Sequence, residues 1–123
     1  MAKLIGKSIL AAIVVFSALA QPANVTGTWT ASFDTQVGKQ EYTYTLKVDG
    51  GALTGTAKGN LITDSTLSDG KVEGNKISFV EKGNYMGMPL TFNYTGELAG
   101  EELKLKRELM GFPAEEFVAK RSQ

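Results

Sequence analysis

The sequence has no cysteine and no histidine among its 123 residues. Without thiols the chain has no disulfide and no thiol nucleophile. Without imidazole it has neither a Cys/His zinc site nor a serine–histidine catalytic pair. Basic and acidic residues are equal at 13 each, so no basic excess indicates a nucleic-acid partner. We therefore expect a protein that is not an enzyme, and we assign no catalytic residue, no metal ligand and no cofactor.

The first twenty residues have the pattern of a secretory signal peptide. Two lysines, Lys3 and Lys7, precede an apolar run, which ends in the small-x-small sequence Ala18-Leu19-Ala20. The run is short for a membrane span and has no stop-transfer flank. We predict a signal peptide over residues 1–20, cleaved near Ala20, and a secreted or periplasmic bacterial protein with no membrane span after cleavage.

The rest of the chain, residues 21–123, reads as a single domain of short strands. Apolar and polar residues alternate with a period of two, as in Trp29, Ala31 and Phe33 on one face. Tight-turn residues such as Asp49-Gly50-Gly51 separate several of these segments. The predicted strands are 25–34, 40–48, 52–58, 66–73, 76–82, 89–98, 101–108 and 114–121. The fourth contains Ser68-Asp69-Gly70, which predicts a bulge or a split.

Eight short antiparallel strands with one apolar face form either a closed barrel or a sandwich. Closure removes the unpaired edges that promote aggregation, and sequential hairpins need no long crossover. We therefore predict an all-β, eight-stranded antiparallel up-and-down β-barrel, with a β-sandwich as the alternative.

Two ends of the domain carry residues that suggest a family. Gly27-Thr28-Trp29 opens the first strand, and Arg121 lies near the end of the last. This combination resembles the signature of the calycins, the group that includes lipocalins and avidins, and residues 49–56 resemble a stretch of avidin-type proteins. Residues 70–79 resemble small secreted bacterial domains of lipocalin-like type. The resemblance implies that Trp29 packs at the closed end of a lipocalin-like barrel beneath Arg121. Avidins surround biotin with several tryptophans, and this chain has one, so biotin binding is not carried over.

Connections in an up-and-down barrel alternate between its two ends. Tight turns at 49–51, 74–75 and 99–100 fall at one end, and longer loops are expected at 35–39, 59–65, 83–88 and 109–113 at the other, which we call the open end. Two of these loops repeat a Met-Gly-x-Pro pattern, at Met86 and Met110. Loops on a rigid scaffold commonly carry recognition, and methionine adapts to irregular partners. The candidate binding residues are Leu61, Ile62, Tyr85, Met86, Met88, Met110 and Phe112.

Alternation also directs two charges, Glu81 and Arg107, toward the interior near the open end, where they would meet the polar group of a ligand. We therefore expect an exported, non-enzymatic, lipocalin-like barrel that binds a small apolar ligand or a protein partner at its open end. The alternative is a structural or interaction domain of the cell envelope or matrix. In that case the same side chains seal the core or join a homodimer.

Overall fold

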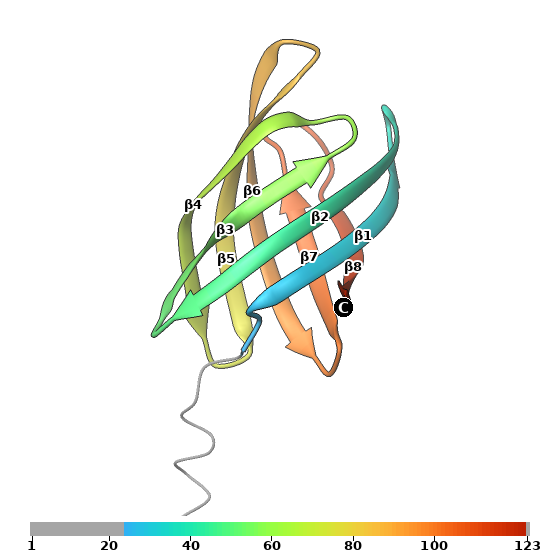
Figure 1. Cartoon of the computed structure of the whole chain (residues 1–123). Coiled ribbons are helices and arrows are strands. Elements are labelled where there is room, and N and C mark those ends of the chain that lie inside the picture. The colour runs from blue at the N-terminus through green and yellow to red at the C-terminus, as the bar shows by residue number, and fades with distance from the viewer. Residues whose placement is uncertain (1–23, 123) are drawn as a thin grey trace, which may run out of the picture.

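The computed structural model describes residues 24–122, and the predicted signal peptide lies outside the described residues. Within residues 24–122 the chain forms eight antiparallel strands in one closed barrel, each paired with its neighbours in sequence, and the last strand returns to the first (Figure 1). The strands are β1 (Gly27–Thr35), β2 (Gly38–Asp49), β3 (Ala52–Gly59), β4 (Thr63–Glu73), β5 (Lys76–Tyr85), β6 (Met88–Ala99), β7 (Glu102–Glu108) and β8 (Glu115–Ser122). The predicted up-and-down barrel is confirmed, and the β-sandwich alternative is wrong.

Two of the longer loops predicted at the open end, 35–39 and 83–88, are wrong. Strand β5 continues to Tyr85 and β6 begins at Met88, which leaves Met86 and Gly87 as a two-residue turn. Both have positive φ, 51° and 83°, the backbone that twisted hairpins prefer. Figure 1 shows this hairpin projecting beyond the other connections of the open end. The longer connections that remain there are 60–62 and 109–114.

The turn between β1 and β2 is organised by one side chain. The Thr35 hydroxyl donates to the carbonyl of Gly38 at 2.8 Å and accepts from the amide of Val37 at 3.2 Å. These bonds replace backbone partners that a tight turn leaves free. Strand pairing therefore continues through residues that the sequence pattern placed in a loop.

Strand β4 is irregular, as predicted. Its pairing with β5 shifts register between Thr63 and Thr66 and again between Ser68 and Lys71. Asp64 and Asp69 both have a φ of 53°, which aspartate tolerates better than most residues. These bulges bend β4 and change which of its residues face the interior.

The ladders of the closed sheet differ in length. Within two groups of strands, β1–β3 and β4–β8, neighbours share six to ten register pairs. Between these strand groups, β3 and β4 share two pairs and β1 and β8 share three. All five pairs lie toward the closed end, because they involve residues near the 50–51 and 74–75 turns or near the start of β1 and the end of β8. We call these two junctions the seams.

The closed end is sealed by Trp29 and Arg121, as the calycin resemblance implies. Trp29 is fully buried, and its indole Nε1 donates to the carbonyl of Val25 at 2.9 Å. The Arg121 guanidinium lies 4.3 Å from the indole ring centroid and donates to the carbonyls of Thr26 and Asn24. This cation–π contact and its hydrogen bonds tie the start of β1 to the end of β8.

Candidate functional site

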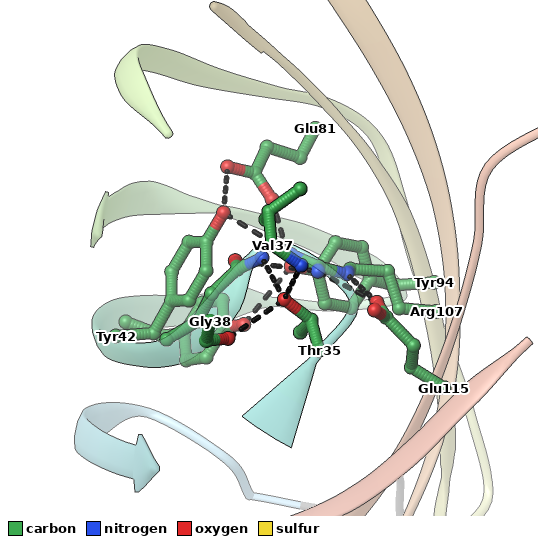
Figure 2. Close-up of polar contacts among 10 residues, drawn as sticks. Thr35, Val37, Gly38, Tyr42, Glu81, Tyr94, Arg107 and Glu115 are labelled. Atoms are coloured by element: carbon green, nitrogen blue, oxygen red, sulfur yellow. Dashed lines mark hydrogen bonds and ion pairs between the residues drawn. The ribbon is translucent and has the colours of Figure 1, made fainter. Parts of the chain in front are cut away.

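The interior of the barrel holds a network of polar side chains that joins the two strand groups, β1–β3 and β4–β8. Glu81 on β5 and Arg107 on β7 are 0% and 2% exposed, so both point inward as predicted. They are linked by Tyr42 of β2, whose hydroxyl donates to Glu81 Oε2 at 2.8 Å and accepts from Arg107 Nη1 at 3.2 Å (Figure 2). The link therefore crosses the barrel from the β4–β8 strand group to the β1–β3 strand group and back.

Glu81 is the acceptor on which the network converges. Tyr42, Tyr94 and Ser65 each donate a hydroxyl hydrogen to its carboxylate, Tyr94 at 2.7 Å. Since the Tyr94 hydrogen is committed to Glu81, the 2.9 Å bond between Tyr44 and Tyr94 must have Tyr44 as its donor. The hydroxyl directions are thus fixed, and every buried polar side-chain atom of the described residues has a partner.

Arg107 has three hydrogen-bonding partners and lies over three aromatic rings. The partners are Glu115, Gln40 and Tyr42, and the rings are those of Phe33, Tyr42 and Phe92. Its Nε and Nη2 contact Glu115 Oε1 of β8 at 2.7 and 2.6 Å, and Nη2 also donates to Gln40 Oε1 at 3.3 Å. Its guanidinium lies 4.2 Å from the centroid of the Phe92 ring. Burial, the largest single effect, lowers the pKa of Arg107, but the combined interactions with Tyr94, Tyr42 and Glu115 raise it above its ordinary value. Arg107 therefore remains a cation inside the barrel.

The three interior phenols resist ionisation. Burial, with a smaller contribution from the charge of Glu81, raises the pKa of Tyr42 and Tyr94 well above the ordinary value of 10. Burial also raises the pKa of Tyr44, although its bond to Tyr94 acts in the opposite direction. A phenolate here would lose hydration and face a carboxylate.

We expect the folded state to lose stability steeply above pH 10. Unfolded phenols release protons near pH 10 while the folded ones keep theirs, so their contribution is complete below pH 10 and falls as the pH rises. Each phenol contributes about 1.4 kcal/mol per pH unit to this loss. Urea unfolding at several pH values between 9 and 11.5 measures the slope, and Tyr44→Phe should reduce it by about a third. An unchanged slope in Tyr44→Phe would contradict the assignment.

Above the polar network the barrel is hollow. A cavity of about 670 Å³, which we call the cup, opens between the β1–β2 and β5–β6 hairpins and the 109–114 connection. Its apolar lining includes Ile62, Tyr85, Met88, Leu90, Phe92, Leu109 and Phe112. Its polar lining includes Gln40, Arg107 and Glu115, so the upper part of the network forms its floor. The interior below is filled by aromatic side chains, among them Tyr44, Phe79 and Trp29.

The structure brings part of the predicted site together. Ile62, Tyr85, Met88, Phe112 and Arg107 line the cup. The remaining four predicted residues do not. Met86 and Met110 are 86% and 94% exposed at the tips of their connections, Leu61 is half-buried outside the cup, and Glu81 lies beneath its floor.

Sequence reasoning missed several residues of the network. Tyr42, Tyr44 and Tyr94 share the inward phase of their strands, but nothing in a single strand identifies a buried carboxylate as their partner. Gln40 and Glu115 also follow the inward phase, at the open-end termini of β2 and β8. Ser65 lies within the first register shift of β4, between Thr63 and Thr66, where alternation does not predict the direction of its side chain.

A comparison of the chain with models of known protein families, with curated proteins and with solved structures finds no match. Residues 24–122 include no helix long and apolar enough to cross a membrane. In the same residues no group of three or more acidic side chains is placed to hold a metal ion.

Proposed function

We propose that this chain is an exported binding protein that takes a small, largely apolar molecule into the cup. The observation that carries the proposal is the cup itself. Its volume of about 670 Å³ falls within the roughly 300–1,000 Å³ typical of small-molecule sites. Its walls are mainly apolar, and a few polar groups converge on the floor, the composition that such sites share.

Two further features support a carrier of the calycin type. The filled closed half gives a rigid base, and the fixed polar network holds the cup floor in one arrangement. The contact between Arg121 and Trp29 is the one that the calycin resemblance implies. The signal-like sequence of residues 1–20 supports export to the periplasm or beyond.

Phe112→Asp is expected to weaken ligand binding strongly, and Met110→Asp is its matched control. Both residues belong to the connection between β7 and β8, but Phe112 lines the cup and Met110 is 94% exposed. A carboxylate in the apolar wall should weaken binding about tenfold or more, because the ligand would desolvate it without a partner. The measurement is native mass spectrometry of protein purified from its exporting host, together with titration by N-phenyl-1-naphthylamine, an uncharged dye that fluoresces in apolar surroundings.

The expected result is an adduct, or saturable dye binding, in the wild type and Met110→Asp and its loss in Phe112→Asp. Equal effects of the two substitutions would place binding on the outer rim rather than in the cup. A wild-type protein with neither adduct nor dye binding would contradict the proposal.

A second candidate function, binding of a protein partner or a second copy of the chain, is favoured by the exposed apolar residues of the open end. These are Val37, Met86, Met88, Met110 and Phe112, with exposed fractions between 48% and 94%. Methionine-rich surfaces adapt to varied partners. A wild-type dimer that Met110→Asp converts to a monomer in the same mass spectra would support this function over the carrier.

A further inference from the structure

We propose that the cup selects apolar molecules whose polar end is a hydrogen-bond donor, an amine above an alcohol, and that it rejects carboxylates. This inference rests on the proposed function and concerns the group that meets the cup floor. A lone arginine at the floor of an apolar cavity would ordinarily indicate an anionic ligand. The contacts of Arg107 point to the opposite preference.

Four of the five N–H donors of Arg107 are already engaged. Nε and one Nη2 hydrogen are directed at Glu115, a second Nη2 hydrogen is directed at Gln40, and Nη1 donates to Tyr42. The Arg107 side chain is only 1% exposed, so an incoming carboxylate could form a two-bond pair with the guanidinium only by displacing Glu115, which contacts it at 2.6 Å. The exchange would replace one carboxylate by another and leave Glu115 without its partner, so it offers the ligand little gain.

Glu115 is the more accessible member of this ion pair, and both residues line the cup. Its side chain is 30% exposed and that of Arg107 only 1%, so a ligand at the floor reaches the carboxylate more readily than the guanidinium. Within residues 24–122, both bonds of Glu115 to Arg107 use Oε1. Its Oε2 is therefore an acceptor that an ammonium or hydroxyl group of a ligand would reach.

The charges around the cup also favour a cationic ligand group over an anionic one. Its charged lining residues are Asp34, Arg107 and Glu115, which sum to 1 − 2 = −1. Glu81 lies directly beneath the floor and adds a further carboxylate. An anion moved from water into this partly desolvated site finds repulsion, whereas a cation finds attraction that the low local dielectric strengthens.

Three competitors with the same ten-carbon chain test the inference. Decylamine, 1-decanol and decanoate are titrated at pH 7.5 against N-phenyl-1-naphthylamine bound to the full-length mature protein. Decylamine should displace the dye at the lowest concentration, and decanoate should need about tenfold more or greater. Glu115→Gln should strengthen the binding of decanoate and weaken that of decylamine. The difference between their displacing concentrations should then become smaller or change sign. Glu116→Gln removes the same charge from the next residue of β8, on the outer face, and should leave the order unchanged.

Displacement by decanoate at the same or lower concentration than decylamine overturns the inference while the proposed function stands. The order in the wild type decides this alone, even where Glu115→Gln does not fold. An effect of Glu116→Gln equal to that of Glu115→Gln overturns the role of Glu115. No saturable binding of the dye or of any competitor overturns the proposed function and this inference with it.

Discussion

Glu81→Gln is expected to lower the free energy of unfolding by about 3–5 kcal/mol, a large part of the stability of a domain of this size. Glu81 is fully buried and accepts hydroxyl hydrogens from Tyr42, Tyr94 and Ser65. Glutamine keeps the size of the side chain but replaces one acceptor oxygen with an NH₂ donor. At least one buried hydroxyl then loses its acceptor, and the charge that balances Arg107 through Tyr42 is removed.

The control for this substitution is Glu116→Gln, which makes the same chemical change at an exposed position on β8. A surface change of this kind is expected to alter the free energy of unfolding by no more than about 0.5 kcal/mol. Urea unfolding followed by circular dichroism measures both. Similar midpoints for the two variants would mean that the network contributes little to stability and does not hold the two strand groups together.

Gly70→Ala is the second large effect, expected at about 3 kcal/mol or more. Gly70 faces Leu53 in one of the two register pairs that join β3 to β4. A Cβ atom at this position would lie 2.0 Å from the carbonyl oxygen of Leu53, and backbone at a paired position has little room to move. Strands β3 and β4 would have to separate at the seam, which has fewer register pairs than any other ladder of the barrel.

Gly51→Ala tests whether the effect is steric and local to the seam. Gly51 belongs to the neighbouring turn, and its carbonyl accepts from the amide of Val72 at 2.9 Å. An added Cβ there would meet the carbonyl oxygen of Val72 at 3.7 Å, an ordinary contact. Gly51→Ala should change the unfolding free energy by less than about 0.5 kcal/mol. Equal losses in the two variants, measured by the same urea titration, would contradict the steric explanation.

The barrel could be predicted from the sequence because period-two alternation and Gly-containing turns are local signals. The predicted loop 83–88 failed for two local reasons. Met86 takes a positive φ that methionine rarely adopts, so no turn signal was visible. The sequence pattern places Gly83 in a loop, yet it lies within β5, where a Cβ would come within 2.6 Å of Ile62 and 2.7 Å of Ser65. Glycine at position 83 therefore leaves room for the neighbouring side chains of Ile62 and Ser65 to pack against β5.

The site was only partly predictable because it depends on contacts around the barrel. Alternation identified Glu81 and Arg107 as inward, but their partners are separated widely in sequence. Tyr42 is 39 residues from Glu81 and 65 from Arg107. Such pairings depend on the register of every ladder between them, which a single sequence does not state. The Met-Gly-x-Pro repeat predicted the cup only in part, because Met88 and Phe112 line the cup while Met86 and Met110 do not.

The short seam between β1 and β8 has a consequence for how the chain reaches its fold. In the described residues, every other ladder joins strands that are consecutive in sequence, so most native contacts are local and form without closing a long loop. The β1–β8 ladder must bring together the two ends of the domain, and the entropic cost of that closure rests on three pairs. We expect the β1–β8 ladder to form late in folding. Arg121 then stabilises it, because its bonds to Asn24 and Thr26 join the two ends of the domain and its bond to Glu101 holds the side chain against the turn between β6 and β7.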